Sequence, residues 1–183
     1  RGQQYAVSSM KSQATEAAVR ILEAGGNAFD AAVAGQAVLA LVDPSSNGLG
    51  ADAVVLVYVA AEKRVYSINA EGTAPALATI GWYNEHNGGQ IPPSDGLLSA
   101  SMPAVIDAWY VMLDRWGTMS FAQVLEPAIE VAENGFPMGE GLARSIGRSE
   151  KIRKYPTTMK VYQPNGRPPE PGEIFRNPDA ARM

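Results

Sequence analysis

The stretch "SQATEAAVRILEAGGNAFDAAVAGQAVLALVDP" (residues 12–44) predicts two consecutive helices. In residues 12–24 the apolar side chains recur at three- and four-residue spacing, which is typical of one face of a helix. Gly25-Gly26 is expected to end this helix, because glycine readily adopts the left-handed conformation at a helix end.

The second helix of this stretch is expected over residues 28–42, where the side chains are small and apolar on nearly every side. Such a composition is typical of a helix that is buried on most of its faces. Asn27 is expected to cap it, and Asp30, three residues later, occupies a capping-box position.

A β-hairpin is predicted after these helices. Residues 54–60, "VVLVYVA", form a continuous apolar run of the kind found in a strand covered on both faces. Residues 64–70, "RVYSINA", alternate more clearly between apolar and polar side chains, as in a strand with one face exposed. Because a stable sheet usually has three or more strands, the hairpin suggests that further strands lie outside this chain.

The remaining sequence is mostly helical up to about residue 155. The elements expected there are a loop over residues 84–101 and helices over 103–116, 120–134 and 139–154. Residues 156–183 hold six of the 13 prolines and no long periodic segment, which indicates an extended arm. The predicted organisation is therefore a helical and hairpin part over residues 1–155, followed by that arm, in a layered α/β structure.

Composition excludes several classes of site. The chain has 183 residues, 46% of them hydrophobic and 19% charged, with a formal net charge of −4 and no cysteine. The acidic balance argues against nucleic acid as a partner, and Lys151, Arg153 and Lys154 are interpreted as a solvated helix face. Without cysteine there is no thiolate zinc site, disulfide or cysteine nucleophile. No apolar run reaches the ~18 residues that span a membrane.

Motifs for catalysis are sparse, and no cofactor is expected. His86 is the only histidine and lies in the polar stretch "NEHNGG", where an exposed position is the simplest interpretation. No metal-binding motif occurs. "NGLGADA" (residues 47–53) has a Gly-x-Gly, but it follows a helix and precedes a strand, the reverse of the phosphate-binding order. Asp52, Glu71 and Glu85 are carboxylates in loops or at a strand end, and solvation is the default interpretation for each.

Four stretches, in series, resemble the γ-glutamyltranspeptidase family. They are "ATEAAVRILEAGGNAFDAAVAGQAVLALVDPSSNGLG" (14–50), "RVYSINAEGTAPALAT" (64–79), "WGTMSFAQVLEPAIEVAENGFPM" (116–138) and "GRPPEPGEIFRNPDAA" (166–181). Any one of these motifs is modest, but together they cover nearly the whole chain in the order of that family's large subunit.

The resemblance implies part of a four-layer αββα fold of the N-terminal-nucleophile hydrolases. It implies a precursor that cleaves itself, so that a new N-terminal threonine of a small subunit becomes the nucleophile for an amide or γ-glutamyl substrate. The partner of this chain would then be the small subunit, or the remainder of the precursor, and a periplasmic or secreted location is favoured. No catalytic residue is assigned to this chain, because its motifs correspond only to the first part of the large subunit.

Two departures from the family pattern bear on the substrate. The family's turn reads R-E-x-A-P-A, and its arginine is held to grip the substrate's α-carboxylate. Alignment on "APA" puts Glu71 in the place of that arginine and Gly72 in the place of the acid. Gly50-Ala51-Asp52-Ala53 stands where a run of glycines is usual. Glu71 is therefore the one predicted substrate-binding residue; in the alternative interpretation, it faces solvent or pairs with a local base such as Arg64.

Both departures put γ-glutamyl specificity in question. They favour an acylase or amidohydrolase of the same family. The alternative is a non-catalytic binding or scaffold protein that retains the fold.

Overall fold

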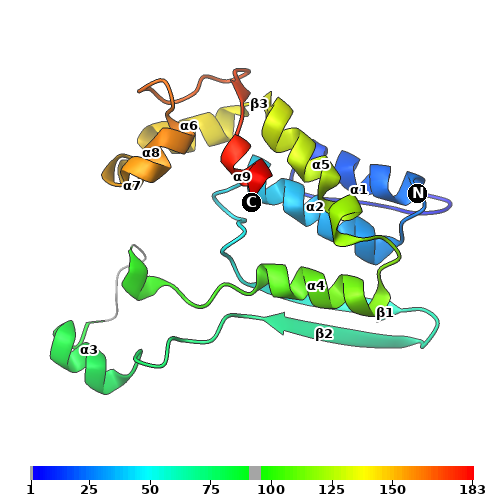
Figure 1. Cartoon of the computed structure of the whole chain (residues 1–183), viewed down its shortest axis with the longest axis horizontal. Helices are drawn as coiled ribbons and strands as arrows, with labels where there is room; N and C mark the ends of the chain where they lie inside the picture. Colours follow the sequence, from blue (N-terminus) through cyan, green and yellow to red (C-terminus); the bar gives the residue numbers. More distant parts are fainter. Residues whose placement is uncertain (1, 91–95) are drawn as a thin grey trace. The chain divides into compact units, whose positions relative to one another are not determined.

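The computed structural model describes residues 2–90 and 96–183 (Figure 1). It divides into two compact units, one made of residues 1–48 and 110–183 and the other of residues 49–109. Among the described residues, the strands form two separate two-stranded sheets, and helices make up most of the rest.

The predicted helix pair is confirmed almost residue for residue. α1 (Ser12–Glu23) and α2 (Ala28–Val42) pack against each other in the first unit, joined through Gly25, whose φ of 95° is in the left-handed region (Figure 1). α2 buries nine of its fifteen residues, as its composition predicts. At Gly35 a Cβ atom would lie 3.2 Å from the carbonyl oxygen of Ala14, so a larger residue there would push the two helices apart.

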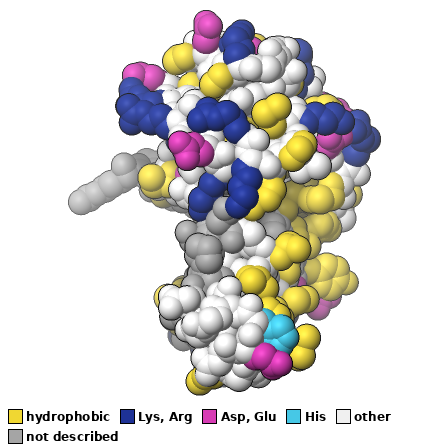
Figure 2. All heavy atoms as spheres, turned by 90° about the vertical axis from the view of Figure 1, so that its left-hand side faces the viewer, with side chains coloured by type: hydrophobic (Ala, Val, Ile, Leu, Met, Phe, Trp, Pro, Cys, Tyr) yellow, Lys and Arg dark blue, Asp and Glu magenta, His cyan; other side chains and the backbone are white. Residues whose placement is uncertain are grey.

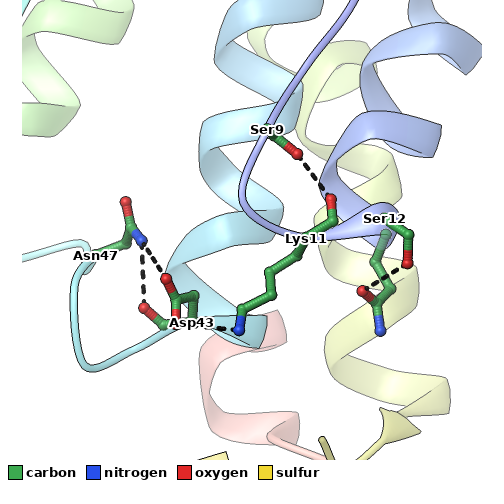
Figure 3. A network of polar contacts seen from close by, with 6 residues as sticks. Ser9, Lys11, Ser12, Asp43 and Asn47 are labelled. Carbon is green, nitrogen blue, oxygen red and sulfur yellow. Dashed lines mark hydrogen bonds and ion pairs between the residues drawn. The ribbon is translucent and has the colours of Figure 1, made fainter. Parts of the chain in front are cut away.

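The other ends of these two helices are joined by a polar network (Figure 3). Lys11, which precedes α1, places its Nζ 3.5 Å from Oδ1 of Asp43, which follows α2. The Asn47 side chain donates to the carbonyl and the carboxylate of Asp43, at 3.3 and 3.4 Å. Ser9 donates from Oγ to the Lys11 carbonyl at 2.7 Å. These contacts hold the entry to α1 beside the exit from α2.

α2 also packs against α5 (Phe121–Asn134), and α5 packs against the short α9 (Pro178–Arg182). α4 (Val105–Trp116) precedes α5, and both helices match the predicted ranges within two residues. Ser120 caps α5, because its side chain accepts a hydrogen bond from the Gln123 amide in a capping box. Trp109 is buried, and Trp116 lies with its ring 5.5 Å from that of Phe29.

The predicted hairpin is also confirmed, but one expectation about it is wrong. β1 (Ala53–Val59) and β2 (Arg64–Ala70) pair antiparallel, from Ala53 opposite Ala70 to Val59 opposite Arg64. Only one face of β1 is covered: Val57 and Val59 are buried, whereas the alternate side chains are exposed. A continuous apolar run indicates that both faces are suited to burial, and it does not reveal what covers them.

Between the hairpin and α4, residues 80–86 form a helix where the sequence suggests loop from residue 84 onward. α3 (Ile80–His86) is capped by Thr79, which accepts from the Trp82 amide, and a single 3₁₀ turn, η1, spans Leu97–Ser99. The prediction of a loop over 91–95 lies outside the described residues.

The C-terminal third is more structured than predicted. The helix expected over 139–154 is interrupted at Ser149, giving α6 (Glu140–Arg148) and α7 (Glu150–Lys154). The extended conformation expected for residues 156–183 is wrong, because α8 (Pro156–Tyr162) and α9 are helical and β4 (Ile174–Phe175) pairs with β3 (Phe136–Pro137).

The prolines of this segment predict an extended arm, but two of them lie where a helix tolerates proline. Pro156 and Pro178 occupy first-turn positions, where a helix tolerates proline because that N–H has no helical partner. The division of the chain into residues 1–155 and an arm remains a prediction.

Candidate functional site

The candidate site is the open end of the hairpin, where β1 begins and β2 ends. Because Ala53 pairs with Ala70, the residues just outside this pair, Asp52 and Glu71, emerge side by side. Glu71 donates its amide to Oδ1 of Asn69 at 3.1 Å, and this local contact fixes the first residue of the turn. Both carboxylates are exposed.

The two carboxylates interact with each other. The negative charge of the neighbouring Asp52 carboxylate raises the pKa of Glu71. Two neighbouring carboxylates resist simultaneous ionisation, so a proton on one of them becomes favourable. The structure therefore brings Asp52 and Glu71 together, although they are 19 positions apart in the sequence.

A third segment braces this end of the hairpin. Ala104 and Val105 donate their amides to the Ala51 carbonyl at 3.1 and 3.0 Å, and Met102 donates to the Thr73 carbonyl at 3.2 Å. The segment 102–105 is thus bonded to the chain on both sides of the Asp52–Glu71 pair, which limits the positions that the two carboxylates can take.

Gly72 is required by this brace. A Cβ atom at Gly72 would lie 1.6 Å from the carbonyl oxygen of Met102, so no other residue fits without displacing the backbone. The close approach of Met102 gives a local reason for glycine at this position.

Other candidate residues stay apart from this pair. The recorded partners of His86 lie in its own helix: its ring stacks on Trp82 at 4.7 Å, and its Nδ1 is 3.0 Å from the Trp82 carbonyl and 3.9 Å from Glu85. Arg64, considered as a partner for Glu71, lies at the opposite end of β2 with its guanidinium 4.9 Å from the Tyr66 ring centre. Glu85 and His86 are both exposed.

Within the described ranges, no group of three His, Cys, Asp or Glu side chains could hold a metal ion. None of the helices in those ranges has both the length and the apolar character needed to cross a bilayer.

Away from this pair, the carboxylate of Asp30 is fully buried. It accepts from the Thr118 hydroxyl at 2.7 Å, from the Thr118 and Met119 amides at 3.1 to 3.3 Å, and from the Asn27 amide at 2.8 Å. Asn27 in turn donates to the Trp116 carbonyl at 2.6 Å. All of these donors are protein groups, so Asp30 joins α2 to the turn before α5 and serves the fold.

This network connects two of the resembling stretches. A Cβ atom at Gly117 would lie 2.8 Å from Oδ1 of Asp30 and 2.7 Å from the Leu113 carbonyl oxygen. The "GGNAFD" and "WGTM" segments therefore contact each other through Asp30. The capping box shows in the sequence, but the bonds to residues 116–119 do not.

Comparison with known proteins identifies the family. The model of the family described as Gamma-glutamyltranspeptidase matches residues 14–183. The chain belongs to the γ-glutamyltranspeptidase family.

Curated relatives agree with this assignment. The chain is 38% identical to the glutathione hydrolase-like YwrD proenzyme of Bacillus subtilis over 88% of its length, and 32% identical to an oxamate amidohydrolase proenzyme of Klebsiella pneumoniae over 92%. It spans 31% and 32% of the length of these two relatives, so most of each lies outside the matched region.

The solved structures give the fold. The whole chain superposes on 53% of the crystal structure of Helicobacter pylori γ-glutamyltranspeptidase, with a TM-score of 0.91 and 28% identity. This likeness confirms the predicted fold class, in which the helices and small sheets described above are part of the αββα N-terminal-nucleophile hydrolase fold.

Proposed function

We propose that this chain is the N-terminal part of the large subunit of a γ-glutamyltranspeptidase-like amide hydrolase or acyltransferase, and that Glu71 disfavours substrates with a free α-carboxylate. The observation that carries the substrate preference is the pair of carboxylates, Asp52 and Glu71, at the open end of the hairpin. The family assignment and the proenzyme names of the relatives support the rest.

The chemistry itself belongs to the remainder of the protein. A threonine at the new N-terminus of the small subunit would attack the amide carbonyl, with its own amine as base, and form an acyl-enzyme. Water or an amine would then take the acyl group. This chain supplies no group to those steps, so we expect the isolated polypeptide to give no turnover of γ-glutamyl or simple acyl anilides above the buffer blank.

The role of the chain is to select the acyl group. An arginine would hold a substrate carboxylate with a planar pair of donors. A glutamate at the same position repels that carboxylate, and Asp52 adds a second negative charge beside it. The expected substrates are amides whose acyl part is neutral or cationic at this end.

The test is the Glu71→Arg variant of the full, processed protein. Specificity constants are compared for a γ-glutamyl anilide and for its analogue without the α-carboxylate. Replacing repulsion with a charge-assisted hydrogen bond should shift their ratio toward the γ-glutamyl substrate by about tenfold or more. Glu85→Arg, the same charge change on exposed α3, is the matched control and should leave the ratio unchanged.

An unchanged ratio in Glu71→Arg would mean that Glu71 does not contact the part of the substrate where the α-carboxylate lies.

The second candidate function, a binding or scaffold protein that retains the fold, is favoured by the same departures at Asp52 and Glu71. Expression of the parent gene separates the two: an active enzyme should appear on a denaturing gel as two chains with a new N-terminal threonine, whereas a scaffold should remain one chain.

A further inference from the structure

The three short helices α6, α7 and α8 carry a concentrated positive charge. Six of the fifteen Lys and Arg residues lie in residues 140–162, together with two carboxylates, Glu140 and Glu150, which gives this segment a formal charge of +4 in a chain of −4. All six are exposed: Arg144, Arg148, Lys151, Arg153, Lys154 and Lys160. In Figure 2, which views the side on which these helices lie, Lys and Arg side chains gather over the upper part of the surface.

The amphipathic character of α6 explains how part of this charge comes together. α6 buries Leu142, Ala143 and Ile146. Arg144 and Arg148 therefore point outward, and side chains four residues apart on a helix lie one turn from each other. The helix ends at Ser149, whose hydroxyl caps α7 by accepting from the Ile152 amide at 3.3 Å.

A shallow cavity of about 460 Å³ lies between these groups, lined by Gly141, Arg144, Ser145, Arg148 and Ser149. Its lining offers two guanidinium groups and two hydroxyls, and none of the lining residues carries a carboxylate. Glu140 pairs with Arg144 from the preceding turn. The Ser149 hydroxyl accepts its capping bond and keeps its proton for another acceptor. Such a set of donors suits a carboxylate.

We propose that the α6–α8 surface is a docking site for an acidic polypeptide segment. One carboxylate of the segment lies between Arg144 and Arg148, and further carboxylates lie along α7 beside Arg153 and Lys154. Lys154 already lies 5.3 Å from the ring centre of Tyr155, a contact that holds its charge near the surface of α7.

An acidic peptide fits this surface better than a nucleic acid does. Outside residues 140–162 the formal charge of the chain is −8, which repels a dense polyanion. Double-stranded DNA carries one charge per ~1.7 Å, whereas an extended peptide places its side chains about 3.3 Å apart. Single-stranded nucleic acids also need exposed aromatic platforms, and Tyr155 is partly buried.

The experiment titrates the full protein into a fluorescein-labelled oligoglutamate at low ionic strength and follows fluorescence anisotropy. Binding should weaken steadily as salt is added, because exposed charge pairs are screened. An oligoglutamine of the same length should not bind. Equal binding of oligoglutamine, or tighter binding of a single-stranded oligonucleotide with the same number of charges, would overturn the proposal.

Two variants locate the site. Arg148→Glu and the double variant Arg153→Glu/Lys154→Glu should each weaken oligoglutamate binding by roughly fivefold or more, since each exchanges attraction for repulsion. Lys63→Glu makes the same charge change in the exposed β1–β2 turn, outside the α6–α8 surface. It should change binding less than twofold, because salt screens charges that do not contact the peptide. The exposed positions should leave the circular dichroism spectrum unchanged, and Arg148→Gln replaces Arg148→Glu if the latter misfolds. Unaltered binding in the Arg148 and double variants, or equal loss in Lys63→Glu, would refute the assignment.

Discussion

The helical unit and the hairpin unit differ in how they bury apolar side chains and pair carboxylates. In the helical unit, formed by residues 1–48 and 110–183, α1, α2 and α5 pack together, and the one fully buried carboxylate, Asp30, has donors on every side. In the hairpin unit, residues 49–109, the strands leave a whole face open and the carboxylates Asp52 and Glu71 repel each other at the surface.

The exposed face of the hairpin is apolar for most of its length. The register aligns Val54 with Asn69, Leu56 with Ser67 and Tyr58 with Val65, and the four apolar members of these pairs are 59% to 72% exposed. A surface of this kind is typical of an interface. The comparison teaches that the helical unit pairs its buried polar groups with its own residues. The hairpin unit instead exposes an apolar face of the kind that another polypeptide would cover in the proposed enzyme.

The largest effect should come from removing the buried carboxylate of the helical unit. Asp30→Ala leaves the Thr118 and Met119 amides without an acceptor inside the fold. Each buried unpaired donor costs about 1–3 kcal/mol, so the variant should lose about 3 kcal/mol or more of unfolding free energy. Urea denaturation measures this loss of unfolding free energy. Glu16→Ala, an exposed acid on α1, should change the free energy by less than about 0.5 kcal/mol; equal losses would remove the contrast.

The second prediction concerns the brace of the hairpin unit. Gly72→Ala places a methyl group against the Met102 carbonyl and should destabilise the protein by about 1–3 kcal/mol, the usual cost of overpacking. Gly81→Ala, a glycine of α3 with open space around it, is the matched change and should be neutral or stabilising by up to about 1 kcal/mol. Thermal unfolding distinguishes the two. If Gly72→Ala is also neutral, the segment 102–105 does not hold the carboxylate pair.

Asp30 and Gly72 illustrate what the sequence could and could not predict. The helices, caps and hairpin follow from local patterns, because a 3.6-residue period, an Asn27 cap or a strand alternation is visible within a few residues. The partners of Asp30 are 88 and 89 positions away, and the neighbour of Gly72 is 30 positions away, so neither contact leaves a local trace.

The sequence predicts Glu71 as a substrate-binding residue, and this role stays a prediction. Its neighbour Asp52 became part of the site only when the register of the hairpin placed the two side by side. From the sequence, Lys151, Arg153 and Lys154 are interpreted as one solvated helix face and are not grouped with Arg144 and Arg148, which lie on α6, on the other side of the break at Ser149.

The third prediction tests the exposed face of the hairpin. We expect the isolated chain to self-associate, because covering apolar surface contributes about 25 cal/mol per Å². Leu56→Thr combined with Tyr58→Thr should weaken this association by roughly tenfold, corresponding to about 1.4 kcal/mol. Sedimentation velocity over a range of concentrations reports it. Ser67→Thr, a polar change on the same face, should have no effect. A chain that sediments as a compact monomer at every concentration would contradict this account of the hairpin.

The smallest effect should be on the titration of Glu71. The charge of Asp52 raises the pKa of Glu71 above its ordinary value of 4.5. In the window between the ordinary and the raised value, the folded protein holds a proton that the unfolded chain has lost, so the contribution of Glu71 to stability falls as the pH rises. Asp52→Asn removes the neighbouring charge and should lower the pKa of Glu71 toward its ordinary value. A carbon NMR titration of the Glu71 carboxyl measures this directly. Glu85→Gln removes an exposed carboxylate from α3 and should leave the titration of Glu71 unchanged. If Asp52→Asn also leaves the titration of Glu71 unchanged, the two carboxylates do not interact. The two units would then no longer differ in the electrostatics of their carboxylates.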